Sequence, residues 1–212
     1  MTIFSNCFQN CFVKYCIKNN YIILQMETME DINTQCFKLN ATNTDDTTIF
    51  KLQFEIRNPR YDLRNSIGFK LYRLIGELNK DTIEQIFIDN YDANSSSVTC
   101  GNVFKQFGKE IGLSQKYIFS KIEKKMDGDN MFIFVSNQIE KPDNVDVPVG
   151  AESVINSSST LIITLHTPHF ASVTCNFSLE LEEDMPTYME NVPVLLMKKL
   201  FARLKIFLES IN

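Results

Sequence analysis

The stretch of this chain with the clearest local pattern is NVFKQFGKEIGLSQKYIFSKIEKK, residues 102–125. Its apolar residues recur at three- and four-residue steps, as they do on the buried face of an amphipathic helix. Gly112 suits the position of positive φ that ends a helix, and Ser114 suits the N-cap of a helix that follows. The stretch therefore predicts two short helices joined at Gly112, with lysines on the outer face.

Two longer helices are predicted on either side of this pair. Residues 61–78 and 192–211 carry apolar side chains at helical spacing, with lysines and arginines outside the apolar stripe. Short β-favouring runs predict strands at 48–57, 82–89, 98–100, 131–138, 160–166 and 170–181. We therefore predict an α+β fold, in which a mixed or antiparallel sheet of about five or six strands packs against two long amphipathic helices and a short central helical pair.

Composition divides the chain into three parts. A chain of 212 residues is long enough for one domain with a substantial core. Residues 1–25 place Phe and Cys at helical steps, and we expect an appended helix or extension there. Residues 26–47 are acidic and polar, which is typical of a linker, so the single folded domain is predicted to span residues 48–212.

Composition also bears on where the protein works. Hydrophobic residues make up 44% of the chain and charged residues 22%, close to the average for globular proteins. The first twenty residues lack the uninterrupted apolar segment of a signal peptide, and no stretch is long and apolar enough to span a bilayer. We therefore expect the cytoplasm or nucleus, where the six cysteines remain thiols. Abundant Asn, Ile, Phe and Lys indicate an AT-rich genome, such as that of a virus.

The motifs of common enzymes are absent from the sequence. The seven glycines never form the dinucleotide-binding G-x-G-x-x-G or the phosphate-binding G-x-x-x-x-G-K-[ST], and the nucleophile elbow G-x-S-x-G is also missing. No nucleophile, general base or cofactor loop can be recognised. We therefore predict a protein that is not an enzyme and that needs no cofactor.

Two groups of residues are candidate metal ligands. The only two histidines, His166 and His169, frame Thr167 and Pro168, and across a tight hairpin they could share a metal. Proline fixes φ near −65° and opposes that tight turn, so two surface histidines are the simpler interpretation. The cysteines at 7, 11 and 16 lack the C-x2-C spacing of zinc sites, and they fit an apolar interface stripe as well. No metal site is predicted.

The segment FGKEIGLSQKYIFSKIEKK, residues 107–125, resembles the helix-turn-helix of phage-repressor-like regulators. The resemblance rests on Gly108, Gly112 and Ile118, which stand at the spacings of that motif. It implies contacts with DNA from a second helix. The residues implied for base edges are Gln115, Lys116 and Tyr117, and those implied for phosphates are Lys121, Lys124 and Lys125. The alternative is a helical hairpin that packs on the sheet.

The leading functional hypothesis is a non-catalytic subunit or adaptor that binds another protein or associates with itself. Residues 194–211 have apolar side chains beyond a single stripe, so one face of the helix can pack on the sheet while another meets a partner. The residues expected at that partner surface are Leu195, Lys199, Arg203 and Ile206. A DNA-binding regulator is the alternative.

Overall fold

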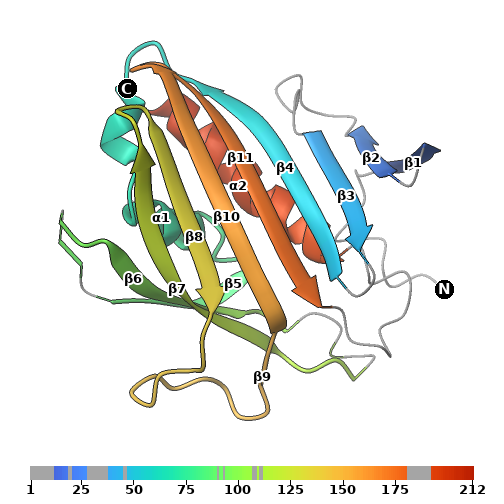
Figure 1. Ribbon diagram of the computed structural model, residues 1–212. Coiled ribbons are helices and arrows are strands. Elements are labelled where there is room, and N and C mark those ends of the chain that lie inside the picture. Colours follow the sequence, from blue (N-terminus) through green and yellow to red (C-terminus); the bar gives the residue numbers. More distant parts are fainter. Residues whose placement is uncertain are drawn as a thin grey trace.

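An antiparallel sheet that curls around two helices dominates the structure (Figure 1). The computed structural model describes residues 12–18, 21–27, 38–44, 47–89, 91–92, 94–106, 109, 112–180 and 192–212. The first four strands are β1 (Phe12–Lys18), β2 (Tyr21–Glu27), β3 (Lys38–Thr44) and β4 (Thr47–Arg57). The others are β5 (Ile83–Ile88), β6 (Ser97–Phe104), β7 (Lys116–Asp127), β8 (Met131–Gln138), β9 (Glu152–Ser153), β10 (Ile155–Thr167) and β11 (Phe170–Glu180).

The order of strands across the sheet is β1-β2-β3-β4-β11-β10-β8-β7-β6-β5, and the short β9 pairs in parallel with β7. Strands β4 and β5 follow one another in the chain, yet β11, β10, β8, β7 and β6 lie between them. The connection from β4 to β5 must therefore cross the sheet. It carries the 3-10 turn η1 (Leu63–Ser66) and helix α1 (Lys70–Leu78) over one face.

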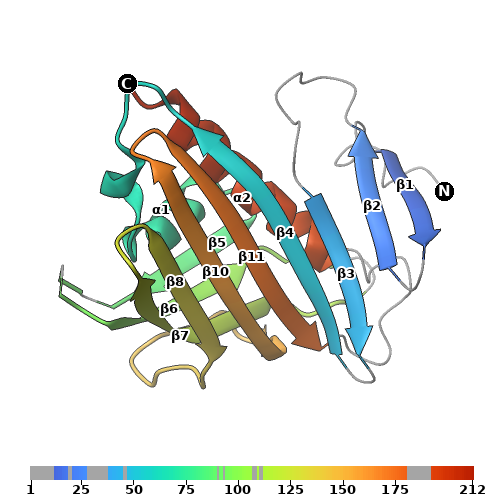
Figure 2. The same cartoon turned by 45° about the horizontal axis from the view of Figure 1, so that its top comes forward.

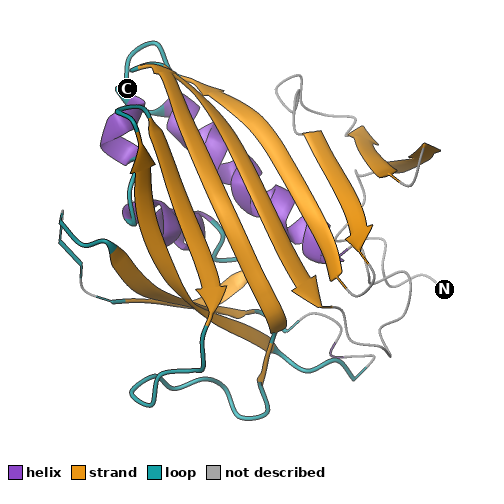
Figure 3. Ribbon diagram, viewed as in Figure 1, coloured by secondary structure: helices purple, strands orange, loops and turns teal. Residues whose placement is uncertain are grey.

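The C-terminal helix α2 (Val192–Ser210) crosses the same face (Figure 2). The colouring by secondary structure in Figure 3 shows both helices on one side of the curled sheet, which is the concave side. None of the helices among the described residues has the length and apolar content needed to cross a bilayer. The two helices and the concave face of the sheet thus enclose the interior of the protein.

The main core lies on this concave face. Directly opposed residues of antiparallel strands share a face of the sheet, so a row can be followed across neighbouring strands. One such row runs from Phe134 on β8 through Leu161 and Cys175 to Leu52 on β4, and all four side chains are buried. Helix α2 packs on the face that this row defines, where the ring centroids of Phe201 and Phe54 are 5.8 Å apart.

The second of the two helices predicted within residues 102–125 is wrong. The first predicted helix begins inside β6, and its residues 107–108 and 110–111 lie outside the described residues. Residues 116–127 form β7, which pairs with β6 on one side and β8 on the other. The four-residue step from Ile118 to Ile122 fits both structures, because an even step also keeps side chains on one face of a strand. Gly112 does have a positive φ, at 80°, as predicted for the end of a helix. It precedes strand β7, however, and does not join two helices.

The predicted fold class is wrong as well. Among the described residues the sheet has eleven strands rather than five or six, and it curls around the helices. The helix predicted over residues 61–78 is divided into η1 and α1 around Gly68, whose φ of 154° is one that residues with a side chain rarely adopt. Helix α2 does form within the predicted range 192–211. Residues 12–18 are a strand instead of the predicted N-terminal helix, whereas the division into extension, linker and domain stays a prediction.

Gly101 provides a test of the strand assignment of β6 and β7. It lies opposite Phe119, and a Cβ on Gly101 would lie 2.2 Å from Cε1 of that buried ring. We expect Gly101→Ala to lower the free energy of unfolding by about 1–3 kcal/mol, because the ring must move within a packed cluster. Denaturant unfolding of Gly101→Ala and of Gly101→Ala with Phe119→Leu measures this, and the smaller leucine should restore part of the loss. Thr99→Ala, on the same strand, is the control, and equal effects of the two alanines would contradict the assignment.

Candidate functional site

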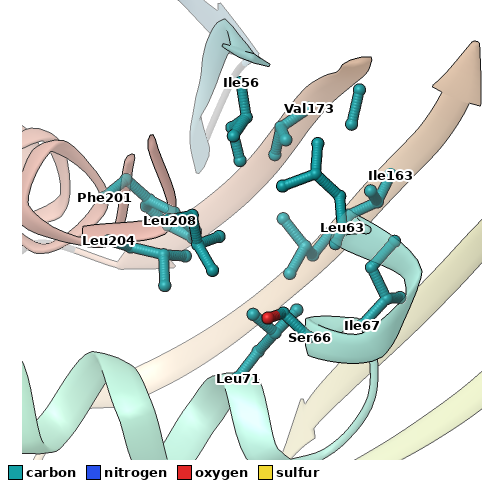
Figure 4. Close-up of a pocket in the computed structure, with 12 residues that line it drawn as sticks. Ile56, Leu63, Ser66, Ile67, Leu71, Ile163, Val173, Phe201, Leu204 and Leu208 are labelled. Atoms are coloured by element: carbon teal, nitrogen blue, oxygen red, sulfur yellow. The ribbon is translucent and has the colours of Figure 1, made fainter. Parts of the chain in front are cut away.

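An apolar cavity of about 20 Å³ lies between the concave face of the sheet and the helices (Figure 4). Its wall comes from β4, η1, α1, β10, β11 and α2. The lining residues are Ile56, Leu63, Ser66, Ile67, Leu71, Leu161, Ile163, Ala171, Val173, Phe201, Leu204 and Leu208. Ser66 is the one polar residue among them, and its hydroxyl donates a hydrogen bond to the Tyr61 hydroxyl at 3.0 Å.

The residues of this wall follow the side-chain periods of a strand and of a helix. Alternate residues of β11, Ala171 and Val173, face inward because side chains of a strand alternate between faces. On α2, Phe201, Leu204 and Leu208 follow three- and four-residue steps and are all buried. Ala171 is the smallest side chain in the wall, and larger side chains surround it.

Asn58 holds the end of α2 against the sheet. Its side chain is buried, and its amide donates hydrogen bonds to the carbonyl oxygens of Leu208 and Ile211, both at 2.8 Å. The last carbonyls of a helix have no partner within the helix, so Asn58 satisfies two of them from the end of β4. Its own side-chain oxygen accepts from the backbone N–H groups of Arg60 and Tyr61 at 2.9 and 3.0 Å. One side chain therefore joins β4, the turn after it and α2.

A second polar link joins α2 to the end of α1. The amide of buried Asn79 donates to the carbonyl of Ile75 at 2.7 Å, and Arg203 on α2 forms a two-pronged ion pair with Asp81. The hydrogen bond from Arg203 holds the pKa of the Asp81 carboxyl well below its usual range, and Lys199 lowers that pKa further. These charged groups are partly exposed, so water screens the pair and its contribution to stability is small. The Asn79 amide also lies 3.4 Å from the carbonyl oxygen of Leu200 on α2, so Asn79 and Asp81 both connect the end of α1 to α2.

Two of the cysteines, Cys100 and Cys175, are structural. Cys100 and Cys175 are free thiols within the core, and burial raises the pKa of each to about 12. A thiol becomes nucleophilic only as the thiolate, so these two are inert at neutral pH.

The histidines have separate hydrogen-bond partners. His166 Nε2 lies 3.0 Å from the Ser172 hydroxyl, whereas His169 Nδ1 lies 3.1 Å from the carbonyl oxygen of Tyr61. Within the described part of the chain, no three His, Cys, Asp or Glu side chains gather in a way that could hold a metal ion.

The residues expected to contact DNA lie on a strand or in the turn before it. Gln115 donates to the carbonyl of Phe104 and to the Glu84 carboxylate, both at 2.8 Å, and Lys116 pairs with Glu152 at 2.8 Å. The remaining four lie along β7. There Tyr117 packs on Phe119, Lys121 lies 3.7 Å from Glu123, Lys124 lies over the Phe69 ring, and Lys125 is exposed. The recognition helix on which these contacts depended does not exist.

The residues expected at a partner surface all lie on α2. Lys199 and Arg203 pair with Asp81 of the same chain, whereas Ile206 is 56% exposed and Leu195 is partly buried. Whether these four residues form a contact surface stays a prediction.

Sequence reasoning missed Asn58, whose only visible signal was the Asn-Pro pair that ends a strand.

Comparison with known proteins gives the fold a precedent. No protein-family model matches the sequence, and no curated protein matches it. Solved structures do match. A fragment of a STAR-related lipid transfer protein from Xanthomonas axonopodis has a TM-score of 0.63 at 9% identity, covering 95% of this chain and 99% of that one. The human StarD13 (DLC2) lipid transfer and protein localization domain has a TM-score of 0.61 at 14% identity, covering 84% of this chain and 87% of that one. Human STARD10 has a TM-score of 0.53 at 11% identity, covering 95% and 76%.

This chain has the fold of StAR-related lipid transfer domains. That finding corrects both functional hypotheses drawn from the sequence, the protein-binding adaptor and the DNA-binding regulator. The protein or nucleic-acid partners, the oligomer and the viral origin that accompanied them have no support among these structural neighbours.

Asn58 can be tested by substitution. We expect Asn58→Ala to lower the free energy of unfolding by about 2–4 kcal/mol, because it leaves buried carbonyl and N–H groups without partners. Asn58→Asp should cost at least as much at neutral pH, since a carboxylate replaces the amide donor against two carbonyl oxygens. Chemical denaturation gives the free energies, with exposed Asn65→Ala as the matched control. A parental melting temperature for Asn58→Ala would show that the end of α2 is held by other contacts.

Proposed function

We propose that this chain binds a lipid, or another mainly apolar molecule, between the curled sheet and the two helices. The observation that carries the proposal is the cavity, in which eleven of the twelve lining residues are apolar and the hydroxyl of the twelfth, Ser66, is already hydrogen-bonded. Apolar concave sites with few polar groups are typical of small-molecule binding. The likeness to lipid transfer domains supports the same function.

The size of the cavity sets a condition on binding. A volume of about 20 Å³ holds about one water molecule, whereas sites for small ligands measure roughly 300–1,000 Å³. A lipid therefore enters only if a helix moves away from the sheet. Uncovering the three buried side chains Phe201, Leu204 and Leu208 costs about 5–9 kcal/mol, at about 1.5–3 kcal/mol for each.

Burial of a hydrocarbon chain offsets that cost. Each methylene group moved from water to an apolar site contributes about 0.8 kcal/mol, so a chain of about ten methylenes matches the cost of opening. Short amphiphiles do not reach this threshold. The site should therefore select long-chain or polycyclic ligands over short ones.

We also propose that the protein works in the cytoplasm or nucleus. The free thiols of Cys100 and Cys175 support a reducing compartment.

The cavity can be filled by substitution. Ala171→Leu adds three carbon atoms to a buried position in the cavity wall, so it should reduce lipid uptake from vesicles at least tenfold while costing about 1–3 kcal/mol of stability. Ser172→Leu makes a related change one residue along the strand, on the convex face, and should leave uptake unchanged. Uptake is measured by mass spectrometry of lipid bound to the re-isolated protein, alongside thermal melting. If a folded Ala171→Leu variant took up as much lipid as the parent, that result would contradict the proposal.

A further inference from the structure

Three buried hydroxyl groups make no hydrogen bond with any described residue: those of Tyr72, Ser136 and Ser157. Buried hydroxyls in proteins nearly always have a partner, and one left without a partner costs about 1–3 kcal/mol. Tyr72 and Ser136 lie near one another, because the Tyr72 ring packs on Phe134 and Ser136 lies two residues from Phe134 on the same face of its strand. Ser136 is also the neighbouring side chain that lowers the pKa of Tyr72. Burial raises that pKa far above its usual value. The two hydroxyls therefore form one unsatisfied polar site.

This site faces the enclosed interior. Tyr72 projects from α1, next to the cavity residue Leu71, and its ring packs edge-on against Phe134 at 6.0 Å. Ser136 lies two residues from Phe134 on β8, so both point to the concave face. Across the sheet Phe134 pairs with Leu161, which lines the cavity. Tyr72 is thus adjacent in sequence to one cavity residue, and Ser136 lies two residues from the cross-strand partner of another.

The surroundings of Tyr72 are mainly apolar and carry no charge. After burial and Ser136, the groups that affect its pKa are the thiols of Cys175 and Cys100, on opposite parts of the curled sheet. Lys124 on β7 places its ammonium 5.7 Å from the centre of the Phe69 ring, and no ammonium, guanidinium or carboxylate is among the groups that shift the pKa of Tyr72. An ionised group placed beside Tyr72 would lie in an apolar interior without an opposite charge, which is costly.

We propose that Tyr72 and Ser136 bind the neutral hydroxyl or carbonyl oxygen of the lipid that the interior takes up. Each hydroxyl can donate one hydrogen bond and accept others, so the pair is complementary to an alcohol or a ketone. The ligand is then a lipid whose polar end is uncharged and buried, with its hydrocarbon part in the cavity lined by Leu71, Leu161 and Leu204. This inference rests on the proposed lipid-binding function.

Three probes of equal chain length test it: hexadecanol, hexadecane and hexadecyl phosphate, each delivered from cyclodextrin to the full chain. Binding is measured by displacement of a fluorescent apolar dye. The parent should bind hexadecanol about tenfold or more tightly than hexadecane, and more tightly than hexadecyl phosphate. Tyr72→Phe and Ser136→Ala should each weaken hexadecanol binding about 5- to 30-fold and leave hexadecane binding unchanged.

Thermal melting without ligand separates this role from a structural one. Neither hydroxyl meets the geometry of a hydrogen bond with a described residue of the free protein, so the melting temperature of each variant should stay the same or rise. Tyr91→Phe, which removes a hydroxyl from the ring packed on Phe69, is the matched control and should bind all three probes as the parent does.

The outcomes distinguish this inference from the proposed function. Parent protein that binds hexadecanol and hexadecane equally, or a Tyr72→Phe variant with parental affinity for hexadecanol, overturns the inference and leaves lipid binding intact. Tighter binding of hexadecyl phosphate overturns the neutral ligand class. Failure of the parent to bind any of the three probes overturns the proposed function, and this inference with it.

Discussion

The amide of Asn58 joins the end of β4 to the end of α2, and the enclosed interior depends on that junction. The last carbonyls of a helix must find partners or water, and here a buried side chain supplies both donors at 2.8 Å. The same side chain orders the turn that leads to η1, through its bonds to the N–H groups of Arg60 and Tyr61. One residue therefore contributes both to the position of α2 over the sheet and to the start of the crossing connection.

The interior enclosed in this way is closed, but it contains a small cavity and buried hydroxyl groups that have no hydrogen-bond partner among the described residues. The wall around Ala171 is apolar and leaves room for about one water molecule, while Tyr72 and Ser136 hold hydroxyls without partners. If stability were the only requirement, larger side chains would fill the cavity and the two hydroxyl groups would have hydrogen-bond partners. Both features are explained together if the interior opens to a ligand with a long apolar body and one neutral polar group. The polar links of α2 through Asn58, Asn79 and Asp81 then fix the closed position to which the helix returns.

Sequence reasoning found the elements whose signal is local. Strands β4, β8, β10 and β11 and helix α2 were predicted, because β-branched and aromatic runs and a long apolar stripe do not depend on distant residues. Residues 102–125 were misread, because the even step from Ile118 to Ile122 fits a strand as well as a helix. The curl of the sheet could not be predicted, since it arises from pairing between segments far apart in the chain. The site was missed for the same reason: Tyr72 and Ser136 are 64 positions apart and meet only when α1 lies on β8.

The central claim is that a lipid occupies the space between α2 and the concave face of the sheet. The most direct measurement is nuclear magnetic resonance on protein with labelled methyl groups, recording magnetisation transfer from the protons of bound hexadecanol to the methyls of Leu, Val and Ile. The account predicts transfer to the methyls of Val173, Leu204 and Leu208, which line the cavity, and none to Ile162 on the convex face of β10. Transfer to Ile162 with none to the three cavity residues would contradict it.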